Sequence, residues 1–160
     1  MIIGITGHQE LDDPSAWDWI QKEFGDFLSQ YQDSLIGVSS LAIGADQYFA
    51  EAVLELGGTL NAVIPFTDYE YEFEEQDRVR YLQFLQRATN IEILNINKTD
   101  EEAFLQAGKT IVDKVDLLVA VWDGKPAAGL GGTADIVKYA KQKAKFILHL
   151  NPINRSIIRY

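Results

Sequence analysis

Three glycines in four positions, Gly129, Gly131 and Gly132, lie between an apolar run and a helix-like pattern, and Thr133 follows them directly. Glycine lets the backbone approach a ligand closely. The first turn of a helix adds unpaired N–H groups and the positive end of the helix dipole, which together favour a bound phosphate. We therefore predict a phosphate-binding loop here. The alternative is a flexible surface turn.

Asp135 stands two residues beyond Thr133, inside the first turn of the expected helix. Its carboxylate could accept hydrogen bonds from the hydroxyl groups of a sugar. In an enzyme that cleaves an N-glycosidic bond, the same group would stabilise the positively charged ribosyl centre or activate water. Asp135 is therefore the candidate catalytic residue, and only if the chain is an enzyme.

Two further segments place glycine beside polar residues directly after an expected strand. Gly7 and His8 follow the first strand, and Gly44, Ala45 and Asp46 open the second helix. In the functional interpretation these residues line a ligand cleft, where His8 donates a hydrogen bond or titrates and Asp46 contacts a sugar. In the alternative, Gly7 serves a turn, His8 caps a helix, and Asp46 stabilises its own helix through the dipole.

Six short apolar runs predict the strands that position these loops. Most are apolar throughout, which is typical of a parallel sheet covered on both faces. The expected strands are 2–6, 35–39, 59–64, 91–94, 117–122 and 146–150. We predict one α/β domain over residues 1–160, a Rossmann-like, doubly wound, mostly parallel sheet of about six strands with helices on both faces.

Parallel strands direct the loops at their carboxyl ends to one edge of a sheet, which is where such folds bind ligands. Segments 6–9, 40–46 and 123–133 follow the first, second and fifth expected strands. We therefore expect them to form one cleft. Segment 99–102 (Thr-Asp-Glu-Glu) predicts a capping box at the start of a helix that runs to about residue 114.

An acidic and aromatic stretch over residues 68–77 precedes another expected helix. A solvated helix start is the simple interpretation. Alternatively, its rings Tyr69, Tyr71 and Phe73 cover a base, while Arg78 or Arg80 reaches a phosphate.

Composition limits the partners that we expect. The chain carries 14 Lys and Arg against 24 Asp and Glu, a net charge of −10, which argues against a nucleic acid or an anionic membrane. With no Cys and two His, no metal site is expected. There is no apolar run of the ~20 residues that span a bilayer, and the chain begins in a strand pattern rather than a signal peptide.

We therefore expect a cytoplasmic protein with a nucleotide-like small-molecule partner, no cofactor, no nucleic acid and no membrane. The apolar tail, with Ile153, Ile157, Ile158 and Tyr160, either contributes to a homodimer or folds back onto its own sheet.

Segments 4–8 (Gly-Ile-Thr-Gly-His), 40–46 (Ser-Leu-Ala-Ile-Gly-Ala-Asp) and 131–135 (Gly-Gly-Thr-Ala-Asp) together resemble the SLOG superfamily of Rossmann-like proteins. The superfamily includes the Lonely Guy phosphoribohydrolases and the DNA-processing protein A family. In its members the late glycine loop holds the phosphate of a nucleotide or related ligand. The resemblance implies the same role for Gly131, Gly132 and Thr133.

The phosphoribohydrolases of this group differ from the present chain at two points. They carry Gly-Gly-x-Gly-Thr followed by Glu, whereas here the shorter Asp135 lies two residues after Thr133. They also use an Arg on the preceding helix, where this chain has Lys109 as its nearest base. Lysine does not reproduce a bidentate guanidinium contact. In addition, Gln9 stands where many relatives have Arg after Gly-His.

These differences favour binding or sensing of a nucleotide or a nucleotide-derived phosphorylated ligand. One alternative is a phosphoribohydrolase that cleaves the base from a nucleoside monophosphate. A second alternative is a protein-interaction domain with a vestigial cleft.

Overall fold

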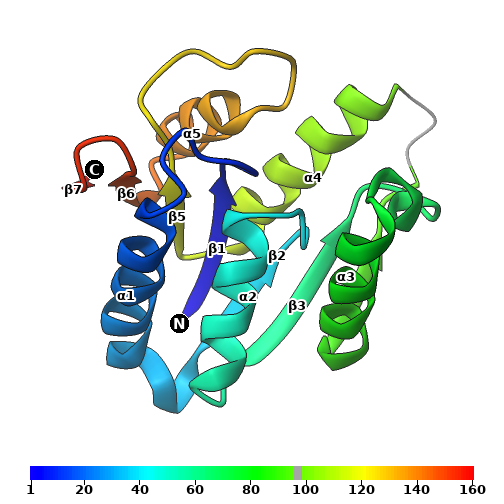
Figure 1. Cartoon of the computed structure of the whole chain (residues 1–160), viewed down its shortest axis with the longest axis horizontal. Coiled ribbons are helices and arrows are strands. Elements are labelled where there is room, and N and C mark those ends of the chain that lie inside the picture. The colour runs from blue at the N-terminus through cyan, green and yellow to red at the C-terminus, as the bar shows by residue number, and fades with distance from the viewer. Residues whose placement is uncertain (96–98) are drawn as a thin grey trace.

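A mostly parallel sheet forms the centre of the computed structural model, which describes residues 1–95 and 99–160 (Figure 1). Its seven strands have the order β4-β3-β2-β1-β5-β6-β7. The strands are β1 (Ile2–Gly7), β2 (Ile36–Ser39), β3 (Thr59–Ile64), β4 (Asn90–Ile93), β5 (Leu117–Val121), β6 (Phe146–Asn151) and β7 (Ser156–Arg159). All neighbouring pairs are parallel except β6 and β7.

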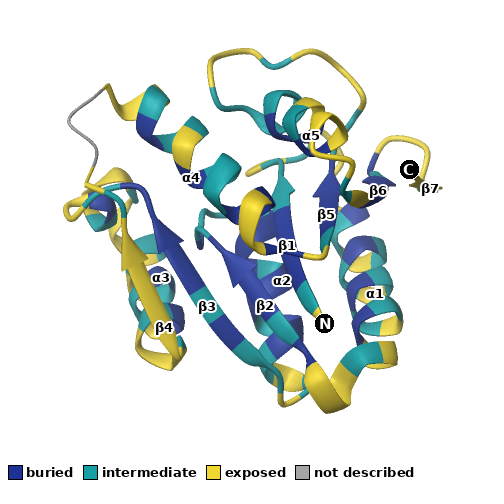
Figure 2. Ribbon diagram, turned by 180° about the vertical axis from the view of Figure 1, so that it is seen from behind, coloured by how far each residue is buried: buried dark blue, intermediate teal, exposed yellow. Residues whose placement is uncertain are grey.

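Helices cover both faces of this sheet, so the predicted doubly wound α/β fold is confirmed (Figures 1 and 2). One face carries α1 (Ala16–Leu28), α2 (Ala45–Glu55) and α3 (Glu75–Arg87). The other face carries α4 (Asp100–Lys114) and α5 (Thr133–Gln142). Two short 3₁₀ helices, η1 (Ser29–Ser34) and η2 (Tyr69–Glu72), follow α1 and precede α3.

The six predicted strands are present, and the tail adds a seventh that the sequence pattern did not predict. β7 pairs antiparallel with β6, Leu148 opposite Arg159 and Leu150 opposite Ile157. The apolar tail therefore folds back onto its own sheet. A strand of four residues that begins directly after a tight turn is too short to show a clear period.

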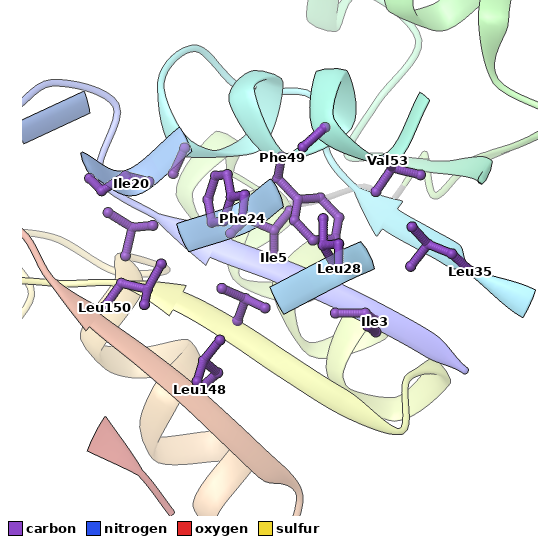
Figure 3. Close-up of a cluster of buried hydrophobic side chains, with 14 residues drawn as sticks. Ile3, Ile5, Ile20, Phe24, Leu28, Leu35, Phe49, Val53, Leu148 and Leu150 are labelled. Atoms are coloured by element: carbon purple, nitrogen blue, oxygen red, sulfur yellow. The ribbon is translucent and has the colours of Figure 1, made fainter. Parts of the chain in front are cut away.

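The largest apolar cluster lies between the sheet and the first two helices (Figure 3). Ile20, Phe24 and Leu28 recur every four residues on α1 and are all buried. The ring of Phe24 meets that of Phe49 on α2 edge to face, with the centroids 5.8 Å apart. This packing fixes the start of α2 against β1, which matters for the cleft described below.

The capping box predicted at the start of α4 is confirmed. Thr99 Oγ1 accepts the backbone N–H of Glu102, and the Glu102 carboxylate accepts the N–H of Thr99. Among the helices of residues 1–95 and 99–160, none is long and apolar enough to cross a bilayer.

The sheet order places the switch point between β1 and β5. The chain first builds β2, β3 and β4 on one side of β1, then crosses to build β5 and β6 on the other. Gly7, at the end of β1, is the register partner of Val121, at the end of β5. The loops that follow these two strands therefore begin side by side, at the position where doubly wound sheets bind ligands.

Candidate functional site

A cleft of about 750 Å³ opens at the carboxyl ends of the strands. All three loops that we expected to converge contribute to it. Of the predicted site residues, those that line it are Gly7, His8, Asp46, Gly129, Gly131, Gly132 and Thr133. Gly44, Ala45 and Asp135 are not among the described residues that line the cleft.

Gly7 and Gly44 hold the β1 loop against the start of α2. The N–H of Ala45 donates to the carbonyl oxygen of His8 at 3.1 Å. A Cβ atom at Gly7 would lie 2.5 Å from the Cβ of Ala45, and one at Gly44 would lie 2.3 Å from the carbonyl oxygen of Gln9. The close approach seen here is therefore between parts of the chain itself, with Gly7 against the Ala45 side chain and Gly44 against the Gln9 backbone. The approach of these glycines to a ligand stays a prediction.

His8 joins the loops that follow β1 and β5. The N–H of Asp123 donates to His8 Nε2 at 3.1 Å, and Asp123 Oδ1 lies 3.3 Å from the same nitrogen. Partial burial would raise the pKa of Asp123, but the N–H of Lys125 and the neighbouring His8 outweigh it and lower that pKa below its usual value.

Asp46 anchors the loop that follows β2. Its Oδ2 accepts the hydroxyl of Ser39 and the N–H of Ser40, both at 3.0 Å, while Ser39 Oγ accepts the N–H of Leu41 at 2.9 Å. Burial raises the pKa of this carboxyl to about 6, although the Ser39 hydroxyl and the backbone N–H groups of the loop act in the opposite direction. In the sequence, Ser39 and Ser40 at the end of an expected strand, with Asp46 in the first turn of the next helix, are the signal that could have predicted this network of hydrogen bonds.

The glycine loop leaves two N–H groups open at the start of α5. The N–H of Gly131 donates to Asp135 Oδ2 at 3.0 Å, and the N–H groups of Asp135 and Ile136 donate to the carbonyl of Gly132. No described group accepts from the N–H of Thr133 or Ala134, and both residues line the cleft. These N–H groups stand at the positive end of the α5 dipole, where an anion is stabilised.

The loop is held in place by α4. Gly131 has a positive φ of 83°, and a Cβ atom there would lie 2.7 Å from the backbone nitrogen of Leu105. Only glycine combines this conformation with so close a contact. The loop therefore has a defined position relative to the helix beside it.

Aromatic rings from the acidic stretch form another part of the cleft wall. Tyr69 is buried, with its ring centroid 5.1 Å from that of Phe73 and 6.1 Å from that of Phe104 on α4. All three residues line the cleft. Tyr71 is 68% exposed and lies outside the described lining.

The arginines next to this stretch do not reach the cleft. Arg78 lies over the ring of Tyr71, and Arg80 forms an ion pair with Glu51 at 3.1 Å. Sequence proximity suggested Arg78 and Arg80 as phosphate ligands, but α3 directs them elsewhere. Neither is among the described lining residues.

The cleft is acidic. Five carboxylates line it, and Lys125 is the single Lys or Arg among the described lining residues; the acids are Asp46, Glu72, Glu74, Asp77 and Asp123. Within residues 1–95 and 99–160, no three His, Asp or Glu side chains are grouped closely enough to hold a metal ion. Backbone N–H groups are therefore the main anion-binding feature of the cleft.

Comparison with known proteins identifies relatives in fold. No protein-family model and no curated protein matches the chain. Among solved structures, DNA processing protein A from Streptococcus pneumoniae superposes with a TM-score of 0.67 at 16% identity, over 92% of this chain and 49% of that one. The Helicobacter pylori protein of the same name gives 0.68 at 14% identity, over 93% and 64%.

A molybdenum cofactor carrier protein from Chlamydomonas reinhardtii superposes with a TM-score of 0.57 at 20% identity, over 94% of this chain and 76% of that one. The chain thus spans about half of the Streptococcus protein and a larger share of the carrier protein.

The expectation that nucleic acid is excluded as a partner is wrong. The Helicobacter protein, which has this fold, binds single-stranded DNA. Our expectation used the net charge of the whole chain, which does not describe how charge is distributed. Residues 136–160 carry six Lys and Arg and no Asp or Glu, so the acidic excess lies entirely in the preceding residues. The Rossmann-like fold that the resemblance implied is confirmed: the chain has the fold of DNA processing protein A and the molybdenum cofactor carrier proteins.

Proposed function

We propose that the chain binds a nucleotide or nucleotide-derived ligand in this cleft, through one phosphate held at the start of α5. The observation that carries the proposal is that the N–H groups of Thr133 and Ala134, two residues that line the cleft, have no hydrogen-bond partner among the described residues. A phosphate there would gain two charge-assisted hydrogen bonds and the favourable end of the helix dipole.

The charge of the cleft supports a ligand with a single phosphate. Each further phosphate adds negative charge beside five carboxylates, and Lys125 offers the only described lysine or arginine to balance it. The aromatic wall with Phe73 and Phe104 gives a base an apolar surface to pack on. Gly7, His8 and Asp46 line the cleft. Gly44 and Ala45 hold the loop after β1 against the start of α2 and so help to shape the cleft.

Binding is favoured over hydrolysis by the placement of Asp135. Its carboxylate accepts the N–H of Gly131, and the residue is not among those described as lining the cleft. A group that activates water or stabilises a ribosyl centre must reach the reacting atoms. The molybdenum cofactor carrier protein from Chlamydomonas, which has this fold, is named for a ligand that it carries, and this supports a binding role.

The proposal is tested by thermal unfolding with nucleoside monophosphates, the matching nucleosides and the matching triphosphates. We expect a monophosphate to stabilise the chain more than its nucleoside or triphosphate, by about 2.7 kcal/mol at 100 times its Kd. Thr133→Glu places a carboxylate beside the phosphate position and should remove the effect, whereas the uncharged Thr133→Gln should retain it. Equal stabilisation of the Thr133→Glu variant would overturn the proposed site.

A chromatographic assay of the same mixtures tests hydrolysis. We expect no free base. Base release that disappears in Asp135→Asn would instead establish the phosphoribohydrolase function.

A further inference from the structure

β7 ends the sheet with an open strand edge. The N–H of Tyr160 donates to the carbonyl of Ile147 and the N–H of Ile147 to the carbonyl of Tyr160. Hydrogen-bonded pairs alternate along an antiparallel ladder, so Ile158 and Ser156 also direct their backbone groups toward β6. The N–H and carbonyl groups of Ile157 and Arg159 therefore point away from the sheet.

The face of this edge that carries α1 offers apolar surface. Arg159 and Ile157 lie opposite Leu148 and Leu150 on the face that carries α1. There, a groove of about 940 Å³ runs between the end of α1 and the sheet; its lining includes Phe27, Tyr31, Phe146, Leu148 and Arg159. Phe146 is 73% exposed and Ile157 is 43% exposed.

The carboxyl-terminal segment that forms this edge is positively charged, while the groove beside it also has Asp116 in its lining. The last 25 residues, 136–160, hold no Asp or Glu. Two of their six bases form ion pairs, Lys143 with Asp113 and Arg155 with Asp13. Lys141 lies 3.6 Å from the ring centroid of Tyr160, beside the strand edge, and Arg159 lies on the strand itself. No described carboxylate forms an ion pair with Lys141 or Arg159.

We propose that β7 binds an extended acidic peptide segment of a partner protein as an additional strand. Its main chain would pair with the outward groups of Ile157 and Arg159, which is the way that sheets accept added strands. Successive side chains of the peptide alternate between the two faces. Apolar ones would enter the groove beside Phe146, and carboxylates would meet Arg159 on one face and Lys141 on the other.

Three kinds of negatively charged partner would be attracted to these cations: a nucleic acid, an anionic membrane and an acidic peptide. The open backbone edge and the exposed Ile157 favour the peptide. A nucleic acid or an anionic membrane would use the cations, but it has no backbone amides with which to pair the N–H and carbonyl groups of a strand. A peptide uses all three features. The binding does not involve the cleft, so it is independent of the function proposed above.

The test uses two pools of short peptides on the immobilised full chain. One pool is randomised over Asp, Glu and apolar residues, and the other replaces the acids by Lys. We expect retention of the acidic pool alone. In the NMR spectrum the backbone N–H signals of Ile157 and Arg159 should shift, while those of Ser156 and Ile158 should shift less. Equal retention of both pools, or shifts confined to other strands, would overturn the proposal.

Two variants separate edge pairing from general charge attraction. Ile157→Pro removes an outward N–H together with the exposed isoleucine side chain, so β7 should still pair with β6 while peptide binding is lost. Ile157→Ala removes the side chain but keeps the N–H, and it should retain more binding than Ile157→Pro. Arg159→Glu should weaken binding about fivefold, since an exposed ion pair contributes up to about 1 kcal/mol. Arg87→Glu, at the end of α3 on the β3–β4 side of the sheet, serves as the charge control and should bind normally.

Three outcomes would assign the surface to another occupant and so refute the proposal. They are binding of oligothymidylate, binding of phosphatidylserine vesicles, and self-association measured by sedimentation. Each outcome counts against the proposal when the interaction is lost in Ile157→Pro and the acidic peptides do not compete with it.

Discussion

The carboxylate of Asp135 accepts a hydrogen bond from the backbone N–H of Gly131, at a distance of 3.0 Å. The contact closes the glycine loop onto the first turn of α5. The Asp135 carboxylate, which the sequence indicated as the candidate catalytic group, is therefore engaged in a hydrogen bond within the loop. The geometry therefore gives Asp135 a structural task within the proposed phosphate site.

The first prediction follows from this bond. Asp135→Ala should lower the free energy of unfolding by about 1.5 kcal/mol, the lower end of the range for a hydrogen bond to a charged group, and should weaken binding of a nucleoside monophosphate. Asp135→Asn should largely retain both properties, because an amide oxygen can still accept from Gly131. Urea denaturation and calorimetric titration measure the two effects. A binding loss in Asp135→Asn as large as in Asp135→Ala would show that the negative charge itself is required.

A second prediction concerns the contact between the glycine loop and α4. Gly131→Ala introduces a Cβ atom 2.7 Å from the backbone nitrogen of Leu105, in addition to the strain of a positive φ. Gly124→Ala has a similar φ of 84° but no atom within 4 Å of the added carbon, which makes it a matched control. We expect about 1 kcal/mol of destabilisation for the control, and clearly more for Gly131→Ala. Equal denaturation midpoints would contradict the close packing of the loop.

The buried carboxyl of Asp46 gives a prediction about pH. Its pKa is raised from 3.8 to about 6 in the folded chain, mainly by burial. Because this pKa is higher in the folded state, protonation of Asp46 favours folding. Its contribution to the free energy of unfolding is fully present below pH 3.8 and is lost as the pH rises through 6. The contribution of Asp46 to the free energy of unfolding should therefore be about 3 kcal/mol lower above pH 6 than below pH 3.8, at 1.36 kcal/mol per pKa unit.

Denaturation of the wild type and of Asp46→Asn across this pH range measures the effect. The stability of the wild type should fall relative to that of the variant as the pH rises. Asp13 and Asp123 have lowered pKa values and give the opposite slope, but they are present in both proteins and cancel in the difference. Parallel curves would show that Asp46 titrates near its ordinary pKa.

Local patterns in the sequence were sufficient to predict most of the fold. The six parallel strands are short apolar runs, and Thr99 with Glu102 forms the predicted capping box because both partners lie within one turn. The convergence of three loops followed from the parallel order alone. These features depend on neighbours in the chain or on a general rule of topology.

Features that depend on distant contacts were not predictable. The type of Gly44 indicated a close approach, but its partner, the carbonyl of Gln9, is brought to it by the packing of α2 on β1. The four residues of β7 become a strand only beside β6. The total charge likewise concealed the separation of a basic carboxyl-terminal segment from an acidic remainder.

The backbone N–H resonances of Thr133 and Ala134 test the central claim most directly. In an NMR titration with nucleoside monophosphates, we expect these two signals to move the most, while the N–H of Gly131, already bonded to Asp135, moves less. The matching nucleosides should leave all three signals in place. If no monophosphate moves the Thr133 and Ala134 signals, or if nucleosides move them equally, the start of α5 is not a phosphate site.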